Sequence, residues 1–289
     1  MLPLKDIYDQ YPEILDILLL DRTKSTKKHE KNIIFANNNY ENFNPKKYKA
    51  IHPITREIFN TNIGEKIIPR SHKSKETQKE RTRCKAEVFT PTWIIKQQND
   101  EAEKDYVNDP LEIYVKVKWL EVACGEAPYI ATRYDMITGE QLPLNEREGF
   151  LDRKLKRING EVNDKLEWQH LVELAYKSCY GFEWSGDSLL LARENLLYTY
   201  CDYYQAKWNT KPAFEYFKKI AIIISYNIFQ MDGLTKTIPL SETKTRTKGK
   251  QMTLFGEILE TDKWEVKPGI RVKIMNWETN KMEYIDKEE

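Results

Sequence analysis

The residues WLEVACGEAPYIA, Trp119 to Ala131, pass within a few positions from an apolar run to a series of small side chains. The apolar positions that lead into them predict a short strand ending on Glu121. These positions are Ile113, Tyr114, Val115, Val117 and Leu120. Beyond Glu121 the small residues Ala123, Cys124, Gly125 and Ala127 follow. They predict a turn at which a ligand can approach the backbone closely.

A second stretch, YGFEWSGDSLLLARENLL from Tyr180 to Leu197, repeats this order of features. It predicts a strand ending on Glu183, a turn with Gly186 and Asp187, and a helix from Asp187 to about Trp208. In an open α/β sheet, ligands bind beyond the carboxyl ends of the strands, where an acidic side chain can accept ribose hydroxyls. Two such ends side by side predict half of a nucleoside pocket, with Trp184 placed to lie against an adenine ring.

Three motifs resemble, in their order and rough spacing, those of adenine-specific DNA methyltransferases of restriction-modification systems. KAEVFTPTWI (Lys85 to Ile94) resembles their EVFTP-type motif, and LEVACGEAPY (Leu120 to Tyr129) resembles LDPACGSGxF. The stretch around Glu183 resembles the motif that comes next. The resemblance covers roughly residues 80 to 235. It implies an α/β fold with a Rossmann-like methyltransferase sheet and flanking helices, and S-adenosylmethionine as the cofactor.

The resemblance also implies roles for single residues. Glu183 matches the acidic residue that holds the cofactor's ribose, and Asp232 is the candidate to receive the adenine amino group. Phe89 and Thr90 match the turn that meets the methionine carboxylate, and a helix start at Thr90 and Pro91 suits such an anion. An ordinary helix cap is the alternative for that turn. The expected cofactor-binding residues are Phe89, Thr90, Glu121, Ala123, Gly125, Glu183, Trp184 and Asp232.

The chain departs from the family pattern in two places. Val122 and Ala127 stand where proline and a second glycine are usual, and a positive φ angle at Ala127 would strain the backbone. The family's NPPY-like motif, which binds the exocyclic amine and stacks on a flipped base, is absent from the sequence. The stretch Asn108 to Leu111 lacks its second proline and its aromatic residue. The catalytic half is therefore expected to be supplied elsewhere or lost.

Composition sets weaker limits on function. A net charge of +1 gives no overall attraction to nucleic acid, so a basic surface has to come from local charge. The four cysteines form no CxxC pair and no zinc-type spacing with histidine, which indicates reduced thiols and no metal site. The sequence shows no signal peptide and no run of eighteen apolar residues. We therefore expect a cytoplasmic protein without a membrane partner.

The segment from Lys66 to Lys85 carries eight Lys or Arg against two Glu. One interpretation is the solvated face of a helix. The other is a surface that contacts DNA phosphates and leads into the cofactor pocket, with Lys73, Lys79, Arg81 and Arg83 as candidate nucleic-acid-binding residues.

The remaining elements complete the predicted organisation. Residues 1–84 are expected to form an N-terminal helical and basic extension with an amphipathic helix over 7–20, and residues 85–289 the methyltransferase-like domain. Glu183 lies 62 positions after Glu121, which predicts a helical insertion at about 135–170 on the rim of the site, ending in a helix over 166–177. The apolar run in 219–234 predicts a buried strand, with a buried helix as the alternative. A polar, basic loop is expected over 235–262.

Two short motifs keep other functions open. QMTLFGE resembles the QxxLF peptide that binds the sliding clamp, through Gln251, Leu254 and Phe255, although an ordinary loop or edge strand is the alternative. Asp232 with Glu242 and Lys244 fits the D…ExK pattern of magnesium-dependent restriction nucleases.

Three hypotheses follow from these patterns. The chain is a DNA methyltransferase component whose catalytic part is supplied by a second methyltransferase or restriction subunit, or by a continuation of the chain. Alternatively, it is a non-catalytic DNA- or partner-binding relative, or a metal-dependent nuclease subunit.

Overall fold

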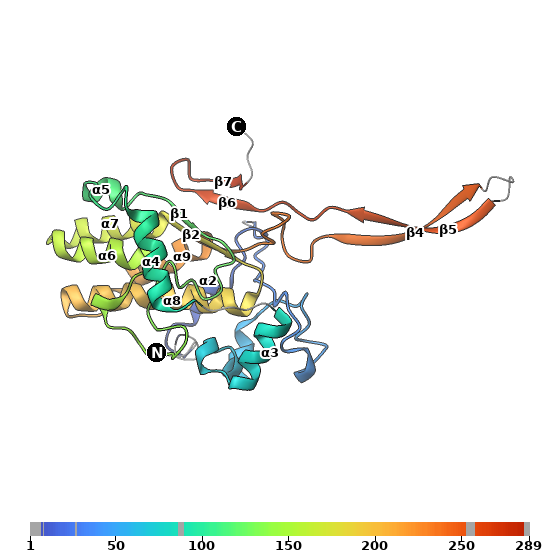
Figure 1. The fold of residues 1–289 in the computed structure, drawn as a ribbon, viewed down its shortest axis with the longest axis horizontal. Coiled ribbons are helices and arrows are strands. Elements are labelled where there is room, and N and C mark those ends of the chain that lie inside the picture. The colour runs from blue at the N-terminus through green and yellow to red at the C-terminus, as the bar shows by residue number, and fades with distance from the viewer. Residues whose placement is uncertain (1–6, 8, 27, 86–89, 253–257, 286–289) are drawn as a thin grey trace.

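The protein combines a small parallel sheet with a layer of helices (Figure 1). The computed structural model describes residues 7, 9–26, 28–85, 90–252 and 258–285. The sheet has the order β1 (Trp119–Glu121), β2 (Cys179–Glu183), β3 (Ile228–Gln230), and both pairs are parallel. Glu121 lies opposite Gly181, and Glu183 lies opposite Gln230. The carboxyl ends of all three strands therefore meet at one edge, and the predicted α/β class is confirmed.

Strand β1 is shorter than the sequence pattern predicts. The residues before it form α5 (Leu111–Tyr114), whose first backbone hydrogen bonds run to the carbonyl of Pro110. The carbonyls of Val115 and Val117 accept hydrogen bonds from the buried ammonium of Lys154, at 3.1 and 2.6 Å. Because a side chain satisfies these carbonyls, this segment needs no neighbouring strand. A strand was predicted from Ile113 onward. This prediction is wrong for residues 113–118, because the strand begins at Trp119.

The segment between β1 and β2 belongs to the main core. Helices α6 (Phe150–Glu161) and α7 (Lys165–Lys177) bury Leu155 and Trp168 in the same apolar cluster as the long helix α8 (Gly186–Trp208). The Asp164 carboxylate caps α7 by accepting hydrogen bonds from two backbone N–H groups of its first turn. The helices predicted over 166–177 and 187–208 are confirmed. The expected excursion on the rim of the site is instead a packed part of the helical layer.

The apolar run after α8 is a helix and not a strand. Helix α9 (Phe214–Asn227) occupies most of it, and only Ile228–Gln230 are extended. Phe217, Ile220 and Ile224 recur at helical spacing and are buried. Helix α9 packs against α7, α8 and the N-terminal α2 (Pro12–Leu19). A run of β-branched residues fits either state, and here packing on three helices decides for the helix.

The N-terminal segment shares this core. Helix α2 turns one apolar face inward, on which Leu15 and Leu18 are fully buried, and residues 31–54 add Phe35 and Ile54 to the same cluster. The amphipathic helix predicted over 7–20 is confirmed for Pro12–Leu19. Short 3-10 turns follow at Glu41–Phe43, Arg56–Asn60, Gly64–Lys66 and Arg70–His72, and then come helices α3 (Lys75–Lys85) and α4 (Thr92–Glu103). Another 3-10 turn is formed by Leu144–Glu146.

Two antiparallel hairpins end the described chain. Strands β4 (Thr243–Met252) and β5 (Ile258–Lys267) form a long ribbon that extends away from the body of the protein (Figure 1). Strands β6 (Lys273–Asn276) and β7 (Lys281–Tyr284) form a shorter hairpin. The segment predicted as a basic loop is therefore mostly paired strand. The alternation of threonine with basic residues at its start suits a pleated ribbon.

Candidate functional site

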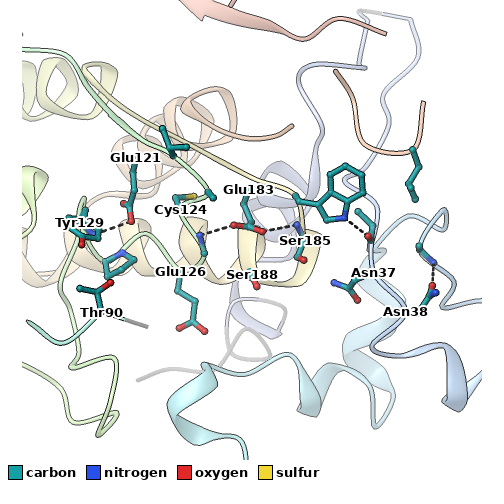
Figure 2. Close-up of a pocket in the computed structure, with 18 residues that line it drawn as sticks. Asn37, Asn38, Thr90, Glu121, Cys124, Glu126, Tyr129, Glu183, Ser185 and Ser188 are labelled. Carbon is teal, nitrogen blue, oxygen red and sulfur yellow. Dashed lines mark hydrogen bonds between the residues drawn. The ribbon is translucent and has the colours of Figure 1, made fainter. Parts of the chain in front are cut away.

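A cavity of about 780 Å³ opens at the carboxyl ends of β1 and β2 (Figure 2). Its lining comes from the turn after β1, the residues after β2, Thr90 and the N-terminal segment around Asn37. The volume lies in the range of small-molecule and cofactor sites. The structure therefore brings together most of the residues expected at a cofactor pocket: Thr90, Glu121, Ala123, Gly125, Glu183 and Trp184.

Glu183 lies at the centre of this pocket. One carboxylate oxygen accepts the backbone N–H of Gly125 at 2.9 Å, and the other accepts that of Ser185 at 3.0 Å (Figure 2). Burial raises the pKa of this carboxyl, and the two backbone N–H groups act in the opposite direction. A carboxylate oxygen has room for a second donor. Glu183 is therefore oriented by the backbone and still able to accept hydrogen bonds from a ligand.

The turn after β1 has an unusual backbone. Ala123, Gly125 and Ala127 all have positive φ angles, of 51°, 55° and 58°. This left-handed region suits glycine and is strained for alanine. The positive φ considered for Ala127 from the sequence is thus present, and Ala127 is fully buried. The turn is anchored to the neighbouring strand by the N–H of Cys124, which donates to the carbonyl of Phe182 at 2.8 Å.

Glu121 holds the far side of this turn. Its carboxylate accepts the backbone N–H of Tyr129 at 3.3 Å (Figure 2) and that of Ile130 at 3.1 Å. Burial raises the pKa of Glu121 to about 8, with the charge of Glu183 adding to the shift and the two N–H groups opposing it. Glu121 therefore shapes the wall of the pocket from β1, and at neutral pH it is largely protonated.

The N-terminal segment supplies the opposite wall, which the sequence patterns did not reveal. The indole N–H of Trp184 donates to the carbonyl of Ala36 at 2.6 Å, so the ring spans from β2 to this segment. Asn37, Asn38 and Ala50 also line the cavity. In the sequence this segment is marked by the asparagine tract at 37–39.

Thr90 lines the cavity, whereas Phe89 lies outside the described residues. Helix α4 begins at Thr92, with Pro91 in the N-cap position, so the helix start lies slightly later than expected. No residue of α4 lines the cavity, so the prediction that a helix N-terminus faces the pocket stays a prediction.

Asp232 does not join the pocket. Its carboxylate accepts the backbone N–H groups of Leu234 and Thr235, at 2.9 and 3.4 Å, and so caps the turn that follows β3. The end of β3 is occupied by Gln230 instead. Gln230 is fully buried, exchanges two hydrogen bonds with the backbone of Ile34 and donates a third to the carbonyl of Trp184. A buried glutamine thus joins the N-terminal segment to the sheet where an adenine-binding acid was expected.

The four basic residues proposed for nucleic acid differ in their surroundings. Arg81 is buried, and its guanidinium pairs with Asp187 at 3.1 Å. Asp187 also accepts hydrogen bonds from Asn37 at 2.9 Å and Tyr40 at 2.8 Å. Lys79 and Arg83 are exposed, and Lys73 is half-buried. The structure therefore gives Arg81 a structural partner, and the phosphate contact stays a prediction for the other three.

The structure adds little support for the clamp-binding motif or for the D…ExK nuclease motif. Gln251 belongs to β4, opposite Leu259, while Leu254 and Phe255 lie outside the described residues. Glu242 and Lys244 form an exposed ion pair at 3.2 Å. Within the described ranges no group of three His, Cys, Asp or Glu side chains is placed to hold a metal ion. None of the helices in this part of the chain has both the length and the apolar character needed to cross a membrane.

Comparison of the chain with protein-family models, with curated proteins and with solved structures gives no match.

Proposed function

We propose that the chain is the cofactor-binding part of an S-adenosylmethionine-dependent DNA adenine methyltransferase of a restriction-modification or phage DNA-modification system. Its sheet is then the first half of a Rossmann-like methyltransferase sheet. The observation that carries the proposal is the position of Glu183. It stands at a strand end inside a cofactor-sized pocket, with its carboxylate oriented by Gly125 and Ser185.

The lining of the pocket fits the cofactor in three respects. Glu183 can accept the two ribose hydroxyls, because each of its oxygens has one backbone donor and room for another. Trp184 offers an aromatic surface beside Glu183 for a purine ring. Thr90, two residues before α4, places a hydroxyl donor on the cavity wall, which suits the methionine carboxylate.

Methyl transfer needs a further group that this sequence does not carry. The cofactor supplies an electrophilic methyl group on its sulfonium, and the target adenine has to present its exocyclic amine in line with that methyl. Known adenine methyltransferases position the amine with an NPPY-like motif, which is absent here. We therefore place the amine-binding residues on a second subunit or a further segment, and the chain itself holds the cofactor.

Calorimetric titration with S-adenosylmethionine tests the proposal. The wild-type chain is expected to bind in the micromolar range. Glu183→Gln should weaken binding about 10- to 100-fold, because hydrogen bonds to a charged group are worth about 1.5–3 kcal/mol. Asp232→Asn is the matched control, since Asp232 lies outside the cavity and should leave the affinity unchanged.

Thermal melts of both variants separate loss of binding from loss of folding. Equal affinity of wild type and Glu183→Gln, or no binding at millimolar cofactor, would contradict the proposal. The second outcome would favour a non-catalytic scaffold, for which the strained alanines in the turn give a physical reason.

A further inference from the structure

The β4–β5 ribbon is an arm with little support from the rest of the protein. Its strands pair over ten residues each, from Thr243 opposite Lys267 to Met252 opposite Ile258. At about 3.3 Å per residue it is on the order of 33 Å long. Neither strand pairs with another strand in the described part of the chain, and the ribbon extends away from the helices (Figure 1). A two-stranded hairpin is marginally stable alone, so an arm of this length is expected to gain stability from a binding partner.

One face of the arm near its base combines cations with exposed apolar side chains. The register places Lys244 opposite Val266 and Arg246 opposite Trp264, and directly opposed residues share a face. Trp264 is 61% exposed and Val266 is 50% exposed. Lys244 pairs with the exposed Glu242, and such surface pairs contribute little. Cations interleaved with an exposed aromatic ring are typical of nucleic-acid-binding surfaces.

The distribution of charge along the chain also favours a nucleic acid as the partner. Residues 243–273 contain eight Lys or Arg and four Asp or Glu, whereas the whole chain has a net charge of only +1. Residues 243–273 therefore carry a local positive excess, as residues 66–85 also do. A polyanion is attracted to such a segment even when the protein as a whole is nearly neutral.

The base of the arm lies at the cofactor pocket. Leu240, three residues before β4, lines the same cavity as Glu183 and Trp184. A ligand held along the arm is thereby brought to the mouth of the pocket. A two-stranded antiparallel ribbon also has the dimensions to enter the major groove of B-form DNA.

We propose that the β4–β5 arm binds duplex DNA, with the face of Lys244, Arg246, Trp264 and Val266 toward the DNA, and holds it beside the pocket. The choice of DNA rests on the proposed function, but binding by the arm does not require the cofactor.

Fluorescence anisotropy with a labelled 20-base-pair duplex tests the arm, without cofactor and over a series of salt concentrations. The double variant Lys244→Gln, Arg246→Gln is expected to bind roughly tenfold more weakly at low salt. Its log–log salt slope should be smaller by about 2, since each lost phosphate contact removes about 0.9. Lys96→Gln with Lys104→Gln is the control, because it removes the same charge from exposed positions in and just after α4 and should change neither quantity.

Other outcomes overturn the inference. Equal salt slopes for the arm variant and the wild type would mean that the arm makes no phosphate contacts. Tighter binding to single strands, lost on Trp264→Ala, would replace duplex binding by base stacking. A concentration-dependent dimer that the arm variants disrupt would make a second copy the partner. Duplex binding without any calorimetric signal for S-adenosylmethionine would keep this inference and refute the proposed function.

Discussion

Replacing Arg81 by methionine is expected to destabilise the protein strongly, although Arg81 belongs to a helix rich in exposed charge. Its guanidinium is a cationic partner of Asp187, which is 1% exposed and lies in the first turn of α8 beside the pocket. Methionine keeps the length and helix propensity of the side chain. The substitution therefore removes the paired charge and leaves the buried carboxylate with its neutral donors, Asn37 and Tyr40, and the charge of Lys73.

Two considerations set the expected loss in the free energy of unfolding. Removing one partner of a buried ion pair typically costs about 3–5 kcal/mol. In the variant, the penalty for leaving Asp187 charged and without Arg81 cannot exceed the cost of protonating it. From an unperturbed pKa of 3.8 that cost is about 4 kcal/mol at pH 7 and about 2 kcal/mol at pH 5. We expect a loss of about 3 kcal/mol at pH 7 that shrinks as the pH falls.

The pH dependence follows from how the pKa of Asp187 differs between the wild type and the variant. Burial opposes ionisation of Asp187, but the charges of Arg81 and Lys73 outweigh it and lower its pKa. In the wild type the stabilisation is therefore constant above about pH 4 and is lost as the pH falls through the lowered pKa. In the variant, burial without Arg81 is expected to raise the pKa of Asp187, so the loss shrinks between pH 7 and pH 5 as this carboxyl becomes protonated. Urea unfolding at pH 7 and pH 5 measures the change, with the exposed Arg83→Met as the control within the same helix. Equal effects of the two substitutions, or a loss that does not depend on pH, would refute the role assigned to Arg81.

Two further predictions concern the pocket walls. The pKa of Glu121 is raised to about 8, so its contribution to stability is present below about pH 4.5 and is lost as the pH rises to 8, by about 1.4 kcal/mol per unit. Glu121→Gln should remove this slope from a series of urea midpoints between pH 5 and 8, and an unchanged slope would contradict the assignment. Gln230→Leu leaves the N–H and carbonyl of Ile34 without their partner and should cost about 2–4 kcal/mol. Proteolysis within residues 31–54 should become faster, and an unaltered cleavage pattern would show that this segment is held by other contacts.

Local sequence patterns were sufficient for the strand ends and the helices that follow them. Glu121 and Glu183 each end a short strand, and the small residues after Glu121 form the expected turn. The pattern also placed α7 and α8 correctly, because the apolar residues of α7 recur at helical spacing and α8 is a long run with no proline and no glycine after Gly186. Such signals depend on neighbours within a few positions, so the sequence carries them directly.

Prediction from the local sequence failed where one sequence pattern is compatible with two kinds of secondary structure. The apolar run in α9 suits a buried strand or a buried helix, and its contacts with α2, α7 and α8 make it a helix. The basic run at 243–250 was expected to be a loop, and its pairing with β5 makes it a strand. In both cases the deciding partner lies on another element, which periodicity within the run does not identify.

The sequence by itself determined the two acidic strand ends and the small-residue turn of the candidate pocket. Only the tertiary structure decided which distant residues close that pocket and which charges are buried. Arg81 meets Asp187 across 106 positions, and Gln230 meets Ile34 across 196. These pairs exist because a buried polar group requires a partner, whatever its distance along the chain. Residue type shows that such a need exists, and the packing of the core decides which residue meets it.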